Sequence, residues 1–118
     1  PLHFKKGRKL RDIIPYPEVN ILPTMGIDHL FVVNDGHLSF ETQDLRLRVA
    51  ADYPGYQLYS TNFPPDVELV DGTAVNLYHA LAIEPVDLVT SEDYEYKNLT
   101  LRKDEVYEKT IKYTIELL

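Results

Sequence analysis

The residue with the clearest chemical potential is a carboxylate that follows an apolar run. Residues 80–83 read Ala-Leu-Ala-Ile, and they lead into Glu84 and Pro85. We expect a strand here, with Glu84 at its exit beside a rigid turn. Burial in a cleft would raise the pKa of this carboxylate toward neutrality and suit it to take a proton from a sugar hydroxyl. An exposed glutamate at a strand end has the same local sequence, so both interpretations stay open.

Two polar residues stand at the start of another apolar segment. Asp28 and His29 precede residues 30–33, which read Leu-Phe-Val-Val. Because neighbouring strand residues point to opposite faces, only one of the two side chains can enter a given cleft. An aspartate there could accept hydrogen bonds from vicinal sugar hydroxyls. The alternative is an aspartate that caps a turn and a histidine with a structural role.

Aromatic and amide side chains occur together between residues 53 and 62. Tyr53, Tyr56 and Tyr59 could pack on the apolar faces of a sugar ring, while Gln57 or Asn62 could hydrogen-bond its hydroxyls. Tyrosines at this spacing are also typical of a sandwich core. The segment is therefore a candidate sugar contact with a purely structural alternative.

The histidines do not indicate a metal site. The chain has four, and none forms a ligand pair of familiar spacing with another: His3, His29, His37 and His79. His79 and Glu84 have opposite parity, so on one regular strand they would face different ways. We expect no metal and no close acid–base pair between these two residues.

The strands that must position these candidate residues are indicated by alternation of apolar and polar residues. Residues 107–117 alternate tyrosine, isoleucine and leucine with charged residues and threonine, as in a half-buried strand, and only Lys109 breaks the pattern. Residues 45–49 alternate leucine and valine with Arg46 and Arg48. Residues 34–37 read Asn-Asp-Gly-His, which predicts a tight hairpin between 31–33 and 38–40.

Further strands are expected at residues 56–61, 77–84 and 97–102, and a proline-rich irregular stretch at 15–26. Short strands at intervals of about ten residues, separated by turn residues, are typical of a sandwich or barrel. The sequence predicts an all-β fold, an antiparallel β-sandwich.

Composition limits the classes of partner. The 118 residues fit one domain, carry a net charge of −7 and include no cysteine. No apolar stretch could cross a bilayer and the charge argues against nucleic acid, so we expect neither membrane nor nucleic acid as a partner and a cytoplasmic location. One short basic cluster is expected to be a solvated arm or a face toward another segment: Lys5, Lys6, Lys9, Arg8 and Arg11.

Five segments taken in order resemble the aldose 1-epimerase family, the galactose mutarotases. They are PLHFKKGRKLRDII, GIDHLFVV, PGYQLYSTNF, ALAIEP and LRKDEVYEKTIKYTI. They look like the family's Pro-Phe-Asp-Phe segment, its Gly-Tyr-Asp-His-Asn-Phe and Pro-Gly-X-Gln-X-Tyr-Thr-Gly-Asn-Phe elements, its Leu-Ala-Leu-Glu-Pro element and its closing Leu-Arg-Pro-Gly-Glu-X-Tyr strand pair. The sequence opens like the middle of a protein, and the resemblance identifies residues 1–118 as the C-terminal part of one such domain, a fragment without its N-terminal part.

The resemblance implies a galactose mutarotase-like supersandwich that interconverts the α and β anomers of an aldose such as galactose or glucose, without a metal or organic cofactor. It places Glu84 on the catalytic base and Asp28 and Gln57 on sugar-binding positions. The family's acid histidine lies in its N-terminal part, so a missing portion or a partner chain would supply the acid and this chain alone would be inactive. The family's Thr-Gly-Asn is Ser60-Thr61-Asn62 here, which leaves the sugar open. The alternative is a non-catalytic carbohydrate-binding β-sandwich module.

Overall fold

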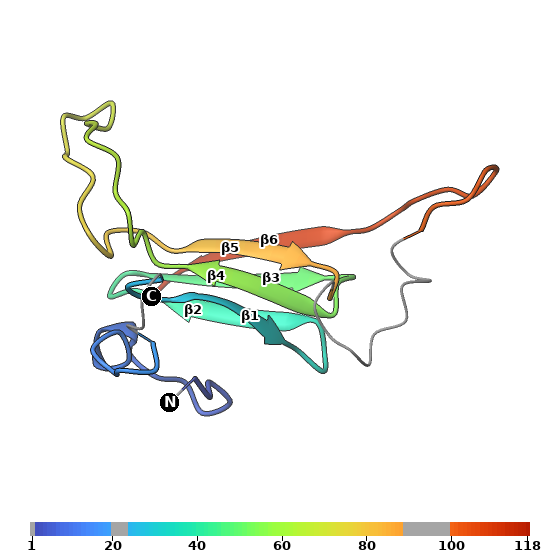
Figure 1. Ribbon diagram of the computed structural model, residues 1–118, viewed down its shortest axis with the longest axis horizontal. Coiled ribbons are helices and arrows are strands. Elements are labelled where there is room, and N and C mark those ends of the chain that lie inside the picture. The colour runs from blue at the N-terminus through green and yellow to red at the C-terminus, as the bar shows by residue number, and fades with distance from the viewer. Residues whose placement is uncertain (1, 20–23, 89–99) are drawn as a thin grey trace. The chain divides into compact units, whose positions relative to one another are not determined.

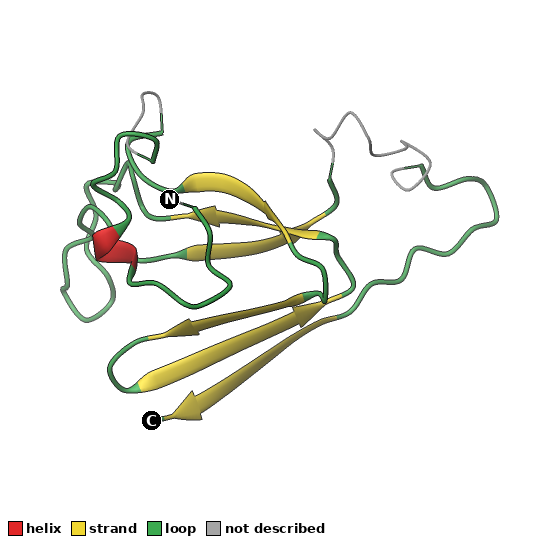
Figure 2. Ribbon diagram, turned by 90° about the horizontal axis from the view of Figure 1, so that it is seen from below, coloured by secondary structure: helices red, strands yellow, loops and turns green. Residues whose placement is uncertain are grey.

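The computed structural model describes residues 2–19, 24–88 and 100–118 of the chain. These residues form six strands and one turn of 3-10 helix (Figure 1). The helical turn is Leu10–Asp12, and the strands are β1 (Asp28–Val32), β2 (His37–Glu41), β3 (Leu45–Ala51), β4 (Gly55–Tyr59), β5 (Ala82–Val86) and β6 (Ile111–Leu117). No α-helix occurs among the described residues, and the red segment in Figure 2 is the 3-10 turn.

The chain divides into two compact units. Unit 1 comprises Pro1–His29 and Gln57–Ile83, and unit 2 comprises Leu30–Tyr56 and Glu84–Leu118. The strands β2, β3 and β6 lie wholly within unit 2. The candidate residues Asp28 and Gln57 belong to unit 1, and Glu84 belongs to unit 2.

The strands form two three-stranded antiparallel sheets, in the orders β1-β4-β5 and β2-β3-β6. This arrangement confirms the predicted all-β antiparallel sandwich class. In the second sheet β3 is central, and Leu47 lies opposite Phe40 of β2 and Ile115 of β6. The alternation predicted for residues 45–49 therefore corresponds to a real strand, with leucine and valine on one face and arginine on the other.

The arginines of β3 are held by carboxylates on its neighbours. Arg46 lies opposite both Glu41 and Glu116, and it donates to Glu41 Oε1 through Nε and to Glu116 Oε2 through Nη1 at 3.2 Å. Arg48 Nη1 lies 3.4 Å from the other oxygen of Glu116. Donation to Glu41 first, and then to Glu116, raises the pKa of the Arg46 guanidinium. The charged row is a cross-strand network that links all three strands.

The predicted hairpin at residues 34–37 is wrong. The strands on either side of this turn do not pair, because β1 belongs to one sheet and β2 pairs with β3 in the other. Gly36 does adopt the positive φ of 69° that an Asp-Gly turn favours. Its carbonyl accepts hydrogen bonds from Ala51 N at 3.1 Å and from the Tyr56 hydroxyl at 2.7 Å. The turn is thus tied to the end of β3 and the start of β4.

The hairpin that does form joins β2 to β3 through residues 42–44. Thr42 N donates to Leu45 O at 2.8 Å, and Leu45 N donates to Thr42 Oγ1 at 3.1 Å. A threonine side chain that accepts a local backbone hydrogen bond stabilises a turn without glycine or proline. For this reason the Thr-Gln-Asp sequence gave no strong turn signal.

Two other strand predictions need correction. The strand expected at 77–84 begins only at Ala82 and runs through Pro85 to Val86, so Glu84 lies in the middle of β5 and not at its exit. Proline fits because β5 is an outer strand of its sheet, where a missing N–H costs no ladder bond. The strand expected at 97–102 lies partly outside the described residues, and residues 100–102 are not in a strand.

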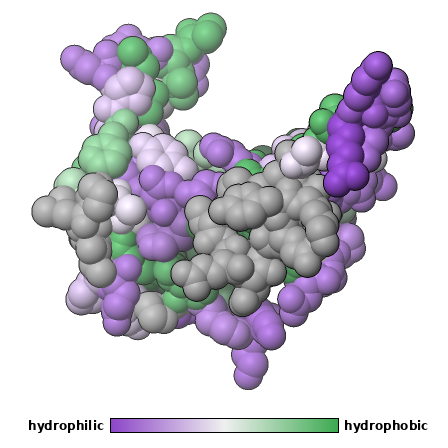
Figure 3. Space-filling view, turned by 45° about the vertical axis from the view of Figure 1, so that its right-hand side comes forward, coloured by the Kyte–Doolittle hydropathy of each residue, from purple (hydrophilic) through white to green (hydrophobic). Residues whose placement is uncertain are grey.

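The buried side chains form a small core in each unit. Unit 1 buries Ile13, Ile14, Val19, Ile27 and Leu58, and unit 2 buries Val49, Tyr56 and Leu88. Many large apolar side chains are exposed instead, including those of Val67, Leu69 and Val70. Figure 3 shows hydrophobic green among hydrophilic purple on the surface it presents. The C-terminal strand, expected to be half-buried, exposes its apolar side: Ile115 is 70% exposed and Leu117 is 86% exposed.

Among the described residues no helix has the length and apolar character to cross a bilayer.

Candidate functional site

Asp28 and Gln57 are brought together although 29 positions separate them in the sequence. Asp28 opens β1 and Gln57 is the central residue of β4. Gln57 Nε2 donates a hydrogen bond of 2.6 Å to Asp28 Oδ1. Because the carboxylate has two oxygens and the amide keeps its carbonyl oxygen, the pair can still accept hydrogen bonds from neighbouring hydroxyls of a sugar.

His29 does not share this position. Its Nδ1 accepts a hydrogen bond of 3.0 Å from Asp28 N, and its side chain is half-buried while that of Asp28 is exposed. The expectation that only one of the two enters a given site therefore selects Asp28. Among the described residues no group of three or more histidines, aspartates and glutamates could hold a metal ion.

A buried polar network supports the backbone next to Asp28. Ile27 N donates to Ser60 Oγ at 2.9 Å, and Ile27 O accepts from Asn62 Nδ2 at 3.0 Å. The Ser60 hydroxyl also donates to Asn62 Oδ1 at 2.6 Å, and both polar residues are only 2% exposed. Such a satisfied buried network holds Ile27, and through it Asp28, in one position.

Asn62 is therefore not the sugar contact that the sequence suggested as possible. Its side-chain oxygen and nitrogen are engaged with Ser60 and Ile27, and burial closes it to a ligand. The sequence placed an amide near Gln57 but could not tell which of the two faces solvent. The structure makes Gln57 the accessible one, with a half-buried side chain.

An unusual backbone surrounds this network. Met25, Thr61 and Tyr78 all have positive φ, at 50°, 52° and 58°. The Tyr78 hydroxyl donates to Met25 O at 2.8 Å, Tyr78 N donates to Thr61 O at 3.2 Å, and Thr61 Oγ1 donates to Ala80 O at 2.9 Å. Left-handed residues other than glycine are strained, and several together are typical of functional sites.

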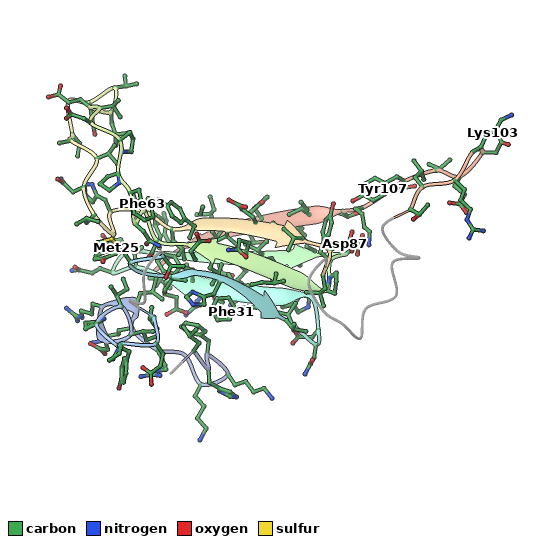
Figure 4. All side chains as sticks on the ribbon, viewed as in Figure 1. Met25, Phe31, Phe63, Asp87, Lys103 and Tyr107 are labelled. Carbon is green, nitrogen blue, oxygen red and sulfur yellow. The ribbon has the colours of Figure 1, made fainter. Side chains whose placement is uncertain are left out.

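Close packing at Gly26 holds this corner together. A Cβ at Gly26 would lie 2.3 Å from Asn62 Oδ1 and 2.9 Å from the ring of Tyr78, so only glycine fits. Figure 4, where Met25 and Phe63 are labelled, shows how densely side chains gather here. The Met-Gly dipeptide is the one local signal for this corner, because its contacts join segments far apart in the chain.

Glu84 lies in β5 with an exposed side chain. The described residues do not bury this side chain. Of the two interpretations of Glu84, the structure agrees with an exposed glutamate, but the residue lies within a strand and not at its end. An exposed carboxylate can still accept a proton from a hydroxyl that is bound next to it.

The tyrosines of the 53–62 segment have separate roles. Tyr56 is fully buried core, and burial raises the pKa of its hydroxyl, so it is closed to a sugar. The Tyr53 hydroxyl lies 2.7 Å from that of Tyr107, and Lys109 Nζ sits 5.1 Å from the centre of the Tyr53 ring. Tyr59, half-buried, accepts a hydrogen bond from Phe63 N at 3.0 Å. The structural alternative therefore holds for Tyr56, and Tyr53 contacts Tyr107 and Lys109.

The basic cluster near the N-terminus is exposed at all five positions. Arg8 lies over the ring of Tyr16, with 5.7 Å between the guanidinium carbon and the ring centre. This exposure agrees with the expected solvated arm. That these residues face another segment stays a prediction.

Comparison of the chain with protein-family models, with curated proteins and with solved structures finds no match.

Proposed function

We propose that the protein is a sugar mutarotase of the aldose 1-epimerase kind, acting on an aldose such as galactose or glucose. In this proposal Asp28 and Gln57 hold sugar hydroxyls and Glu84 is the base. The acid comes from a segment other than the residues described. The observation that carries the proposal is the 2.6 Å hydrogen bond between Gln57 and Asp28, the two residues that the resemblance places on sugar-binding positions.

The backbone at Thr61 gives independent support. Thr61 stands where the family pattern has glycine, and it has a φ of 52°, in the left-handed region that glycine adopts without strain. A β-branched residue rarely has this conformation. The fit between a family glycine and a left-handed backbone supports the alignment of residues 54–63 with the family element, and hence the position of Gln57.

The proposed reaction is two opposed proton transfers. The Glu84 carboxylate takes the proton from the anomeric hydroxyl, the acid protonates the ring oxygen, and the bond between C1 and that oxygen breaks to give the open-chain aldehyde. Rotation about the C1–C2 bond and reclosure by the reverse transfers give the other anomer.

The second candidate is a carbohydrate-binding module without catalysis, and the exposure of Glu84 favours it. The Asp28–Gln57 pair needs no further group to accept hydrogen bonds, whereas an acid–base enzyme needs a base positioned against its substrate. In the described residues the side chain of Glu84 is exposed. Binding of galactose or glucose without turnover by the complete protein would establish this second function.

The decay of optical rotation of freshly dissolved α-galactose and α-glucose distinguishes the two candidates. With the complete protein, Glu84→Gln should slow the catalysed decay by about a hundred- to ten-thousand-fold, the usual contribution of one positioned proton transfer. Glu68→Gln, which changes an exposed glutamate outside β5, is the matched control and should leave the rate unchanged. A Glu84→Gln protein as fast as the unchanged one would remove Glu84 from the mechanism.

A further inference from the structure

The C-terminal strand has an open edge. β6 is an outer strand of the β2-β3-β6 sheet, and no other described strand pairs with it (Figure 2). Its seven residues contain no proline, and its register with β3 is unbroken from Leu45–Leu117 to Ala51–Ile111. Natural sheets usually protect an open edge with a bulge, a proline or an unpaired charge.

The ladder with β3 determines which backbone groups face that edge. Just beyond the two ends of β6, Asp52 N donates to Thr110 O and Leu118 N donates to Asp44 O, both at 3.0 Å. Hydrogen-bonded pairs alternate along an antiparallel ladder, so the even-numbered residues of β6 bond to β3. The odd-numbered residues, from Ile111 to Leu117, turn their N–H and C=O groups to the open edge.

The side chains of the same odd-numbered residues form an exposed apolar row. Ile111 is 40% exposed, Tyr113 is 54%, Ile115 is 70% and Leu117 is 86%. Strand-pairing groups and uncovered apolar side chains thus occur together along one edge. This combination is the usual template for adding another strand.

The sequence of β6 is complementary to itself in one antiparallel register. With Thr114 opposite Thr114 of a second copy, Ile111 faces Leu117 and Tyr113 faces Ile115, all apolar pairs between odd-numbered residues. On the other face Lys112 lies opposite Glu116, twice by symmetry, so the charges attract. Apolar pairs, Thr–Thr pairs and opposite charges are the cross-strand pairs that stabilise an antiparallel sheet.

This register also agrees with the hydrogen-bonding pattern. It matches odd-numbered residues, whose backbone groups face the edge, with odd-numbered residues of the second copy. Thr114, which bonds to β3, falls at the symmetry axis in a non-hydrogen-bonded pair, where Cα atoms approach to about 4.5 Å. An unpaired lysine on an edge strand would oppose the addition of another strand. In this register Lys112 is paired with Glu116 of the second copy.

We propose that two copies of this chain pair antiparallel along β6, about a two-fold axis at Thr114, and join their β2-β3-β6 sheets into one continuous sheet. Glu116, which already binds Arg46 and Arg48 within its own chain, then also receives Lys112 of the second copy. The contact uses the same surface on both copies, so it closes as a dimer.

A single cysteine tests the register, because the chain has no cysteine of its own. Thr114→Cys should form a covalent dimer under mild oxidation, since the two Cα atoms fall within the range of a disulfide. Lys112→Cys is the matched control. Its two copies would be four residues out of register, about 13 Å apart along the strand, and should not cross-link. Equal cross-linking at both positions would overturn the proposal.

Light scattering over a range of concentrations tests the contact itself. The unchanged chain should approach the mass of two copies, and Lys112→Glu, which sets like charges opposite each other twice, should raise the dissociation constant at least about tenfold. Lys103→Glu makes the same charge change in an exposed segment outside β6 and should have no effect.

Ile115→Pro removes an N–H that the ladder with β3 does not use, so the chain should fold and stay monomeric. Circular dichroism checks that the strands persist. A chain that is monomeric at every concentration, or an Ile115→Pro dimer as tight as the unchanged one, would contradict self-pairing.

Discussion

At the scale of single residues, the accessible pair of Asp28 and Gln57 stands in contrast to the buried Asn62 beside it. All three could hydrogen-bond a sugar by residue type, but the amide of Asn62 is engaged with Ile27 and Ser60. The Gln57 amide gives one hydrogen to Asp28 and keeps its oxygen. Residue type indicated the candidates, and burial selects among them.

The Tyr53–Tyr107 pair predicts an alkaline dependence of stability. Tyr107 points from the extended segment before β6, where it is labelled in Figure 4. Its hydrogen bond with Tyr53, together with desolvation, raises the pKa of Tyr107 to about 12. The unfolded chain loses this proton near the ordinary tyrosine value of about 10, whereas the folded chain keeps it. The folded state then binds more protons, and the free energy of unfolding falls as pH rises from about 10 to about 12.

Denaturant unfolding at several pH values between 9 and 12 measures this effect. Tyr53→Phe removes the hydrogen bond, so the fall between pH 10 and 12 should become shallower. Tyr16→Phe, which changes an exposed tyrosine in the other unit, should leave the slope unchanged. The assignment fails if both variants have the slope of the unchanged protein.

At the scale of elements, the strands with strong local alternation are the ones that the sequence could predict. The strand at 45–51 and the one at 111–117 both show it, because side-chain parity is a local property. Which strands pair with one another could not be predicted from local sequence. The Asp-Gly turn predicted a hairpin, but Gly36 bonds to Ala51 and Tyr56, and the β2–β3 hairpin depends on the side chain of Thr42.

The strained corner could not be predicted for a related reason. Its stability depends on hydrogen bonds between Ile27 and residues more than thirty positions away, and on Tyr78 reaching back to Met25. Long-range contacts of this kind override local preference, and they place Thr61 in a conformation that its own type disfavours. Where local and tertiary requirements conflict, a functional site is a common explanation.

Close packing at Gly26 predicts a large loss of stability when a side chain is added there. Gly26→Ala adds a methyl group that would collide with Asn62 Oδ1, and its φ of 154° already disfavours a side chain. We expect a loss of about 2–5 kcal/mol in the free energy of unfolding, from strain and overpacking together. Gly72→Ala is the matched control, with a φ of 82° and open space around it, and should cost only about 1–2 kcal/mol. Denaturant unfolding compares the two, and equal losses would contradict the packing described for this corner.

At the scale of the whole molecule, the two units divide the proposed chemistry. The sugar-binding pair belongs to unit 1, whereas Glu84, the tyrosine pair and the self-complementary strand belong to unit 2. Each unit has its own buried residues and its own internal hydrogen bonds. Asp28 and Gln57 thus belong to one compact unit and the self-complementary strand β6 to the other.

The side-chain amide of Gln57 offers the most direct test of a sugar site in this chain. Its two NH₂ resonances, assigned by comparison with Gln43, the only other glutamine, can be followed by NMR during titration with galactose and with glucose. We predict a saturable shift of the Gln57 resonances with at least one sugar and no shift at Gln43. Asp28→Ala should weaken that binding about tenfold or more, since it removes a charged hydrogen-bond partner, whereas Asp71→Ala, in an exposed turn, should not change it. Gln57 resonances that stay unmoved by both sugars, or that respond equally in both variants, would contradict the account.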